Sequence, residues 1–209
     1  MNQMIEPNSG FAIPEGIAWA KGLIPAVVQD VDTGLVLMLG YMNEEALQQT
    51  CALGQVTFYS RSKQRLWTKG ESSGHVLKLV SIAVDCDGDT LLVLARPHGP
   101  TCHQGTVTCF GDFPGPELAF LGELGRLVET RHAERPAGSY TTKLFESGTR
   151  RIAQKVGEEG VETALAAVAQ DAEALLGESA DLLFHLLVLL RDRGLGLDDL
   201  ARTLRARHR

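Results

Sequence analysis

The sequence predicts two domains of different class: a mostly antiparallel β (α+β) domain over residues 1–113 and an all-α helical bundle over residues 114–209. Three observations predict this division. In the first half apolar residues form short runs with the spacing of strands, whereas in the second half they recur every three or four residues, as in helices. Between the halves, "FGDFPGPE" (residues 110–117) holds two Gly and two Pro in eight positions, which is typical of a domain linker.

Strand patterns account for most of the first half. "AVVQDV" and "GLVLMLGYM" flank the turn-like "DTG", a short helix is expected near residues 43–53, and the strand "QVTFYS" follows it. Further on, "LVSIAVDC" and "TLLVLAR" flank the turn-like "DGD". The pattern therefore predicts a strongly twisted sheet with little helix.

Helical patterns occupy the second half. Apolar residues recur at helical spacing over residues 120–128 and again over residues 152–168, after a break at "ERPAGSY". The segment "SADLLFHLLVLLRDRG" (residues 179–194) is apolar nearly all round and ends in Arg and Gly, as helices commonly do. Helices joined by short breaks predict a bundle.

Composition and charge exclude several classes of protein. The content of 44% hydrophobic and 22% charged residues is ordinary for a soluble globular protein, and no apolar run approaches the roughly 20 residues that span a bilayer. The net charge of -6 argues against a nucleic-acid binder, and the first ten residues lack the features of a secretory signal. We therefore expect a cytoplasmic protein without membrane or nucleic-acid partners. Reduced thiols or metal ligands are then expected at its four cysteines, Cys51, Cys86, Cys102 and Cys109.

The stretch "VDCDGDTLL" (residues 84–92) interleaves soft and hard metal ligands. If the strand continues through it, Asp85 and Asp87 face one way and Cys86 the other, so one ion cannot easily use all three. Asp85, Asp87 and Asp89 suit Mg²⁺ by ligand type. Asp-Gly-Asp is also ordinary hairpin chemistry, which remains the alternative.

The thiolate of Cys86 needs soft companions, and Cys102 and Cys109 in "HGPTCHQGTVTC" are the available ones. The set stops at three unless His103, His98 or Cys51 joins it. Three protein ligands with a fourth position left for water are the arrangement of a catalytic zinc site. The alternative is that these cysteines are small buried apolar residues.

The basic segment "FYSRSKQRLWTKGESSGH" (residues 58–75) concentrates guanidinium, ammonium and hydroxyl donors. These are the groups that a phosphate monoester requires, although a solvated basic loop has the same composition. The candidate residues for binding substrate and phosphate are Arg61, Ser62, Trp67 and Lys69.

Four stretches of the first half together resemble the phosphoribosyl-AMP cyclohydrolase family over about residues 25–110: "YMNEEAL", "VTFYSRSKQRLWTKGESSGH", "DCDGD" and "HGPTCHQGTVTCF". Members of that family hydrolyse the N1–C6 bond of the adenine ring in phosphoribosyl-AMP. The resemblance implies Mg²⁺ on the three aspartates of "DCDGD". It also implies zinc on Cys86, Cys102 and Cys109.

The resemblance further implies a homodimer, in which Cys86 of one subunit meets Cys102 and Cys109 of the other. A zinc-activated water would then attack C6 of the adenine ring. His103, next to Cys102, is the candidate for transferring a proton or orienting this water, and a merely polar histidine is the alternative.

Acidic residues of the second half gather on two predicted helices. Glu158, Glu159 and Glu162 form one contiguous stripe at about 100° per residue, and Glu178 and Asp181 lie one turn apart on the next helix. Two such faces packed together offer oxygen ligands for Mg²⁺. A salt-bridged surface stripe is the alternative, and the histidine at position 185 is expected to be a core residue with satisfied hydrogen bonds.

The segment "SYTTKLFESGTRRIAQKVGEEGVETALAA", together with "ADLLFHLLVLL", resembles the phosphoribosyl-ATP pyrophosphohydrolase family of all-α nucleotide pyrophosphohydrolases, over about residues 118–204. The resemblance implies release of pyrophosphate by cleavage of the α–β phosphoanhydride. It implies Mg²⁺ on the five acidic residues, with Glu158 and Glu159 as catalytic candidates and Lys143 and Lys155 as charge stabilisers.

Together the two resemblances predict a bifunctional hydrolase that acts on small nucleotide substrates in consecutive steps of histidine biosynthesis. One alternative is a general nucleotide pyrophosphohydrolase whose sheet half only mediates oligomerisation. Another is a protein that binds nucleotides without turnover.

Overall fold

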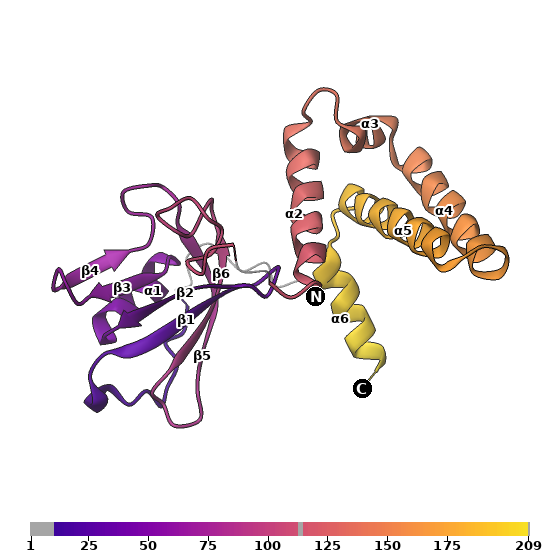
Figure 1. Ribbon diagram of the computed structural model, residues 1–209. Helices are drawn as coiled ribbons and strands as arrows, with labels where there is room; N and C mark the ends of the chain where they lie inside the picture. The colour runs from indigo at the N-terminus through magenta and orange to yellow at the C-terminus, as the bar shows by residue number, and fades with distance from the viewer. Residues whose placement is uncertain (1–10, 113–114, 209) are drawn as a thin grey trace. The chain divides into compact units, whose positions relative to one another are not determined.

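The computed structural model describes residues 11–112 and 115–208 of the chain (Figure 1). The chain divides into two compact units, with the division between Ala119 and Phe120. The boundary expected between residues 113 and 114 lies outside the described residues. The first unit contains all the strands of the described chain, and the second consists of helices, so the predicted fold class is confirmed.

The sheet of the first unit has the strand order β2-β1-β6-β5. Its strands are β1 (Ile24–Asp30), β2 (Val36–Met42), β5 (Leu77–Val84) and β6 (Leu91–Pro97). Two antiparallel hairpins, β1–β2 and β5–β6, meet through one parallel pair at the centre, β1 with β6. Alternate residues of β1 are fully buried, because one face of the strand packs into the core.

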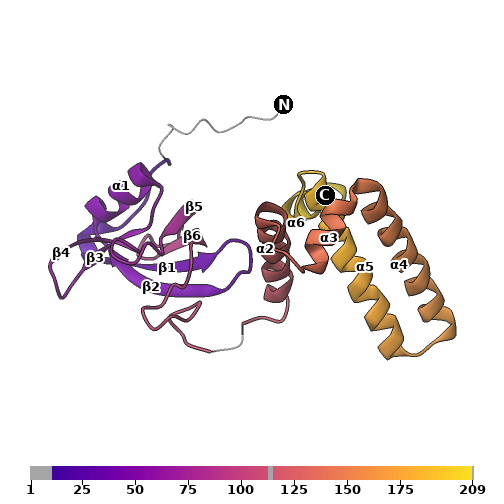
Figure 2. The same ribbon diagram turned by 90° about the horizontal axis from the view of Figure 1, so that it is seen from above.

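Helix α1 (Glu44–Leu53) packs against β2 and β3 of this unit (Figure 2). Its first turn is capped by Asn43, whose side-chain oxygen accepts a hydrogen bond from the backbone N–H of Ala46 at 2.8 Å. The helix ends at Gly54, which has the left-handed φ of +63° that terminates helices. The buried face of α1 includes Cys51, as expected for a cysteine without other function.

A separate hairpin of β3 (Thr57–Ser60) and β4 (Arg65–Thr68) presents the basic segment. A strand at β4 is not predicted by the sequence, because its charged and polar residues suggest a loop. The pairing with β3 explains it: Phe58 and Trp67 are cross-strand partners whose rings stack with centroids 5.7 Å apart. A short 3-10 helix, η1 (Trp19–Lys21), precedes the sheet.

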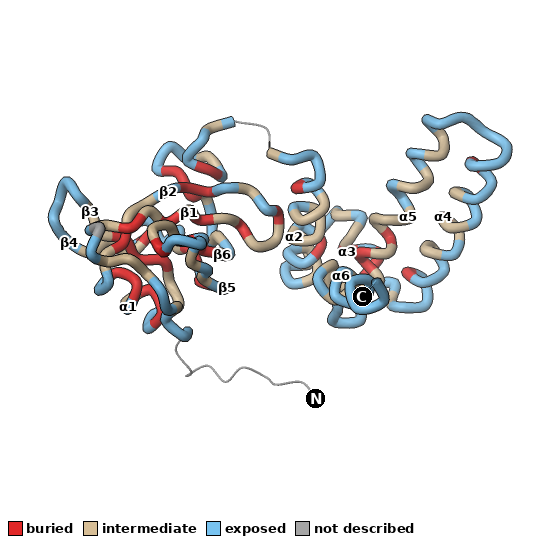
Figure 3. Tube along the Cα trace, turned by 90° about the horizontal axis from the view of Figure 1, so that it is seen from below, coloured by how far each residue is buried: buried red, intermediate tan, exposed pale blue. Residues whose placement is uncertain are grey.

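The described chain continues with five helices, which lie in the second unit except for the first residue of α2: α2 (Ala119–Glu134), α3 (Tyr140–Ser147), α4 (Thr149–Ala169), α5 (Ala172–Asp192) and α6 (Leu197–Arg207). Helices α4 and α5 form a long antiparallel hairpin, and α3 packs against both (Figure 1). The buried apolar core lies towards one end of this hairpin (Figure 3), and it consists of Val128, Leu144, Phe145, Ile152, Leu187 and Val188. Within the described chain, no helix has both the length and the apolar character that crossing a bilayer requires.

Candidate active sites

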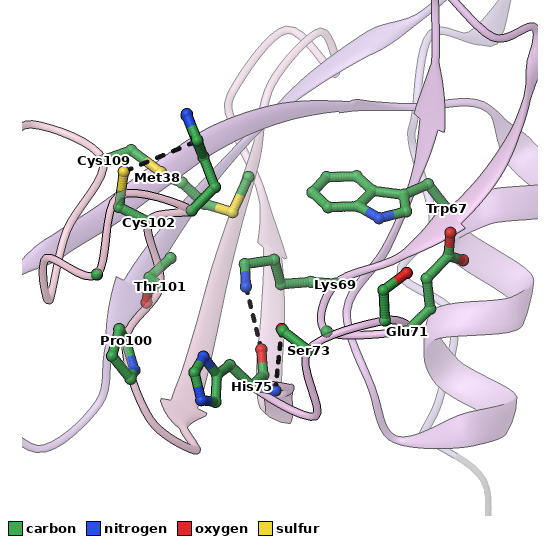
Figure 4. A pocket seen from close by; sticks show the side chains of 14 residues that line it. Met38, Trp67, Lys69, Glu71, Ser73, His75, Pro100, Thr101, Cys102 and Cys109 are labelled. Atoms are coloured by element: carbon green, nitrogen blue, oxygen red, sulfur yellow. Dashed lines mark hydrogen bonds between the residues drawn. The ribbon is translucent and has the colours of Figure 1, made fainter.

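Two of the predicted zinc ligands, Cys102 and Cys109, meet at a pocket of about 430 Å³ in the first unit (Figure 4). The backbone N–H of Cys109 donates to the carbonyl oxygen of Leu37 at 2.8 Å, which anchors this end of the loop on β2. The N–H of Gln104 donates to Sγ of Cys102 and lowers the pKa of that thiol, whereas burial raises the pKa of Cys109. The two thiols of the site are therefore shifted in opposite directions by their surroundings.

Lys69 brings a buried positive charge to the same pocket. Its side chain is only 7% exposed, and its Nζ donates to the carbonyl oxygen of His75 at 3.0 Å. Burial lowers the pKa of Lys69, while the neighbouring Cys109 and Cys102 act in the opposite direction. An ammonium in this position can balance negative charge that develops on the thiols or on a bound ligand.

The four predicted substrate-binding residues divide between two adjacent pockets. Lys69 lines the thiol pocket, whereas Arg61 and Ser62 line a second pocket of about 570 Å³, and Trp67 lines both. The guanidinium of Arg61 lies over the ring of Tyr41, 4.0 Å from its centroid. The structure therefore separates the exposed arginine at the hairpin tip from the buried lysine near the thiols.

His103 lines the thiol pocket, where its Nδ1 lies 3.9 Å from Sγ of Cys102. Sequence reasoning did not identify His75, which lines the same pocket. A Cβ atom on Gly99 would lie 2.7 Å from the His75 ring, so this glycine, with φ of +83°, makes room for it. No pattern in the sequence singles out His75, whose backbone N–H donates to Oγ of Ser73.

The carboxylates of Asp85, Asp87 and Asp89 come together, with one oxygen of each within 4.8 Å of the others. The strand alternation assumed for this stretch is wrong, because β5 ends at Val84 and the chain turns from Asp85 onward. Oδ1 of Asp85 accepts the backbone N–H groups of Asp89 and Thr90, at 2.9 and 3.0 Å. Burial alone would raise the pKa of Asp85, but these N–H groups hold it below its usual value.

Cys86 lies far from the other two predicted zinc ligands of its own chain. Cys109 is anchored on β2, and Cys86 follows β5, which is the strand at the opposite edge of the sheet. Three strand spacings of about 4.8 Å separate these edges, roughly 14 Å, whereas thiolates that share a zinc ion lie about 4 Å apart. A site with all three cysteines therefore requires a second copy of the chain.

In the second unit, Glu159, Glu178 and Asp181 bring carboxylate oxygens within 4.8 Å of one another between α4 and α5. Glu159 is only 5% exposed, and its Oε1 lies 2.6 Å from Nζ of Lys155. This lysine lowers the pKa of Glu159. Burial, followed by the charges of Glu159 and Glu178, raises the pKa of nearby Glu162. The cluster thus has more negative charge than its one lysine balances.

Glu158 differs from the other four predicted ligands of this unit. Its carboxylate contacts Lys155 at 2.9 Å, Gln154 at 2.7 Å and Arg151 at 3.4 Å, which makes it part of a surface ion-pair network. These ion pairs are those of the salt-bridged alternative, and the role of Glu158 as a Mg²⁺ ligand and catalytic residue stays a prediction. Lys143 is exposed on α3, and the contacts described for it do not connect it with the acidic cluster.

His185 and Tyr140 stand beside the acidic cluster. His185 is 4% exposed, with its Nδ1 2.8 Å from the carbonyl oxygen of Asp181 and its Nε2 3.0 Å from Oη of Tyr140. Nδ1 also lies 3.7 Å from Oε1 of Glu159. The expectation of a buried histidine with satisfied hydrogen bonds is therefore met, but the contact with Glu159 and the part played by Tyr140 were not foreseen.

Comparison with known proteins identifies both halves. Residues 38–111 match the phosphoribosyl-AMP cyclohydrolase family, and residues 121–208 match the phosphoribosyl-ATP pyrophosphohydrolase family. The histidine biosynthesis bifunctional protein HisIE of Xanthomonas axonopodis pv. citri is 69% identical over 192 residues, covering 91% of this chain and 92% of that protein. The protein of the same name from Xylella fastidiosa strain Temecula1 is 65% identical over 204 residues, or 97% of each chain. The chain therefore belongs to the family of bifunctional enzymes of histidine biosynthesis that have both phosphoribosyl-AMP cyclohydrolase and phosphoribosyl-ATP pyrophosphohydrolase activity.

Proposed function

We propose that the helical unit converts phosphoribosyl-ATP to phosphoribosyl-AMP and pyrophosphate, and that the sheet unit then opens the adenine ring of phosphoribosyl-AMP. The observation that carries this assignment is the separation of ligand chemistry between the units. Thiols gather in a pocket within the cyclohydrolase match, and carboxylates gather between two helices within the pyrophosphohydrolase match. Soft ligands favour zinc, and hard ligands favour Mg²⁺.

The thiol pocket fits a zinc ion shared between two copies of the chain. Cys102 and Cys109 supply two adjacent thiols, and the anchoring of Cys109 on β2 leaves Cys86 of the same chain out of reach. In a homodimer, Cys86 at the exposed β5–β6 turn would complete the set from the other subunit. Zinc bound there would supply Lewis-acid chemistry that makes water a nucleophile near neutral pH.

The remaining residues of the pocket have roles that follow from their positions. Trp67 offers an aromatic face on which the purine ring can stack, and Lys69 supplies positive charge close to the reacting bonds. His103 lies at the rim beside Cys102, where its imidazole can transfer a proton to the departing ring nitrogen. Arg61 and Ser62 in the neighbouring pocket supply donors for a phosphate of the substrate.

The two carboxylate clusters fit Mg²⁺. Asp85, Asp87 and Asp89 occupy one turn, and Glu159, Glu178 and Asp181 converge from two helices. In sites that bind phosphates, Mg²⁺ is usually held by one or two carboxylates together with several waters and the substrate phosphates, and each cluster offers that many oxygen ligands. In the helical unit, Glu162 would join the second cluster, and Lys155 would hold the carboxylate of Glu159 in place. Mg²⁺ bound there would neutralise the charge of the phosphoanhydride under attack.

The assignment is tested by supplying phosphoribosyl-ATP to the full chain and measuring pyrophosphate and ring opening separately. Ring opening is followed by ultraviolet absorbance. The Glu178→Gln variant should stop pyrophosphate release while added phosphoribosyl-AMP is still consumed, and Cys109→Ala should do the reverse. Loss of ring opening in Glu178→Gln supplied with phosphoribosyl-AMP, or of pyrophosphate release in Cys109→Ala, would contradict this division of labour.

A further inference from the structure

A buried histidine connects the acidic cluster of the helical unit to helix α3. His185 interrupts the apolar run of α5, yet both nitrogens of its ring are engaged, Nδ1 with the carbonyl oxygen of Asp181 and Nε2 with Oη of Tyr140. Tyr140 is the first residue of α3, which begins at the cap formed by Ser139. The histidine is therefore held between two helices rather than free to turn.

The partners of the ring determine where its hydrogen lies. A carbonyl oxygen can only accept, so Nδ1 of His185 carries a hydrogen and donates it to Asp181 at 2.8 Å. The same Nδ1 lies 3.7 Å from Oε1 of Glu159, so the positive edge of the ring faces that carboxylate. This holds whether or not Nε2 is also protonated, because Nδ1 bears a hydrogen in both forms.

Aromatic neighbours fix the plane of the ring. The rings of Tyr140 and His185 meet edge to face, with centroids 6.1 Å apart and an angle of 86°. Phe184 meets His185 in a similar way, with centroids 5.3 Å apart at 74°. Tyr140 and Phe184 also stack on each other, with centroids 6.2 Å apart, so the three rings form one packed group that restricts rotation of the His185 ring.

Lys155 acts on the same oxygen of Glu159 from another direction. Its Nζ lies 2.6 Å from Oε1 of Glu159 and 2.9 Å from Glu158, which belongs to the surface ion-pair network. A carboxylate held by this lysine alone could still swing about the contact with Nζ. Nδ1 of His185, which lies 3.7 Å from the same oxygen, adds a second contact from α5 that restricts this motion.

We propose that His185 and Tyr140 are positioning residues, which hold Glu159 and the Asp181 turn in the arrangement that binds a divalent cation without contacting the cation themselves. The inference rests on the proposed assignment of this cluster to Mg²⁺. Groups that orient metal ligands from behind typically change metal affinity by about 10–100-fold when removed.

The test measures the affinity of the full chain for Mn²⁺ alone, from the electron paramagnetic resonance signal of the free ion. Glu159→Gln defines the binding that occurs elsewhere in the chain and is subtracted. The His185→Leu variant should bind Mn²⁺ at this cluster about tenfold more weakly or worse, and Tyr140→Phe should bind several-fold more weakly. His185→Asn should retain much of the affinity, because its Nδ2–H can still donate to the Asp181 carbonyl and face Glu159.

Ser147→Ala is the matched control, since it removes a hydroxyl from the same helix as Tyr140, and among the described residues this hydroxyl bonds to the carbonyl of Leu144 in its own helix. It should bind Mn²⁺ as the wild type does. A second readout is pyrophosphate release by Tyr140→Phe, which should recover at raised Mg²⁺ concentration. Ring opening of added phosphoribosyl-AMP and thermal unfolding report whether each variant is folded.

Wild-type Mn²⁺ affinity in folded Tyr140→Phe and His185→Leu would overturn the inference. An equal loss of Mn²⁺ affinity in Ser147→Ala would also overturn it, as would a loss in His185→Asn as large as that in His185→Leu. Either result would mean that the variants weaken binding by disturbing the fold and not by removing the donated hydrogen bond. If the wild type itself shows no Mn²⁺ binding that depends on Glu159, the assignment of the cluster fails, and this inference fails with it.

Discussion

The two units of this enzyme assemble their ligand sets in opposite ways. In the helical unit, Glu159 on α4 meets Glu178 and Asp181 on the adjoining helix, so the packing of one helical hairpin is enough to bring three carboxylates together. In the sheet unit, Cys102 and Cys109 lie on a loop anchored to β2, and Cys86 follows the strand at the other edge of the sheet. One chain thus brings three of the predicted carboxylates together, whereas it does not bring the three predicted thiols together.

The difference shows that a well-formed sheet or helical bundle does not by itself bring the ligand side chains of its elements together. Residues one helical turn apart on packed helices come together from local geometry alone. Residues on opposite edges of a sheet stay apart however well the sheet is formed, because strand spacing is fixed. The proposed shared site would make ring opening depend on association of two chains, while pyrophosphate release would need only one folded helical unit.

The largest expected effect comes from mixing inactive chains. Cys86→Ser and Cys102→Ser should each abolish ring opening, but co-expressed chains should recover about a quarter of wild-type activity, since half of randomly formed dimers are mixed and each contains one intact site. Co-expressed Glu159→Gln and Asp181→Asn chains should recover no pyrophosphate release, because each helical cluster then lacks a ligand of its own. Recovery of pyrophosphate release in the second mixture, or no recovery of ring opening in the first, would contradict this difference between the two units.

Removal of zinc should separate the two activities next most strongly. After treatment with a zinc-selective chelator and return of Mg²⁺, we expect ring opening to fall by about 100-fold or more and pyrophosphate release to stay near its original rate. The two products of the same preparation are measured in parallel, and readdition of zinc should restore ring opening. A parallel loss of both activities would mean that zinc maintains the whole fold.

Much of the fold was predictable because the signals were long and periodic. The change from strand-like to helical spacing, together with Gly and Pro between the halves, predicts two units of different class, and the structure confirms them. Strand β4 escaped prediction, because Arg65 and its polar neighbours suggest a loop when pairing with β3 is not visible. The predicted strand through Cys86 failed because Asp85 accepts two backbone N–H groups and closes a turn.

The candidate sites were predictable in their chemistry but less so in their geometry. Motif spacing indicates that acidic residues of two helices face each other, as Glu159, Glu178 and Asp181 do. It does not reveal that Glu158 turns to the surface, because Lys155 lies three residues before Glu158 and four before Glu159 and can pair with both. The two adjacent pockets that separate Arg61 from Lys69 likewise depend on how the hairpin folds over β2. Family membership, and not the geometry, excludes the alternative of a sheet half without activity.

A smaller effect distinguishes neighbouring carboxylates of the helical unit by pH. The pKa of Glu162 is raised by burial and by Glu159 and Glu178. Protonated Glu162 therefore stabilises the folded state below the usual glutamate pKa, and this stabilisation is lost as pH rises through the raised value. Glu162→Gln should therefore raise the melting temperature slightly at neutral pH without metal, and the gain should vanish in acid.

Glu158→Gln is the control, for which we expect a change in melting temperature of opposite sign. Lys155 lowers the pKa of Glu158, so the stabilisation it provides is present above the usual glutamate pKa and is lost as pH falls through the lowered value. This variant should melt slightly earlier than the wild type at neutral pH and converge with it in acid. Thermal unfolding of the metal-free chains across pH measures both effects. Changes in melting temperature of the same sign for the two variants at neutral pH would contradict the charges assigned to Glu158 and Glu162.

The smallest expected effect concerns one buried hydroxyl in each unit. Oγ1 of Thr101, in the wall of the thiol pocket, and Oγ1 of Thr142, on α3, are buried without a hydrogen-bond partner among the described residues. Thr50 is the matched contrast, because its hydroxyl donates to the carbonyl of Ala46 and accepts the N–H of Thr57.

Leaving a buried polar group unpaired costs about 1–3 kcal/mol, so Thr50→Val should lose about that much unfolding free energy in urea. Thr101→Val and Thr142→Val should lose nothing or gain up to about 1 kcal/mol, since valine removes a polar atom that bonds to nothing. A loss of unfolding free energy in Thr101→Val as large as that in Thr50→Val would mean that the Thr101 hydroxyl forms a hydrogen bond in solution. The buried hydroxyl in the wall of the thiol pocket would then be as fully hydrogen-bonded as that of Thr50 in the core.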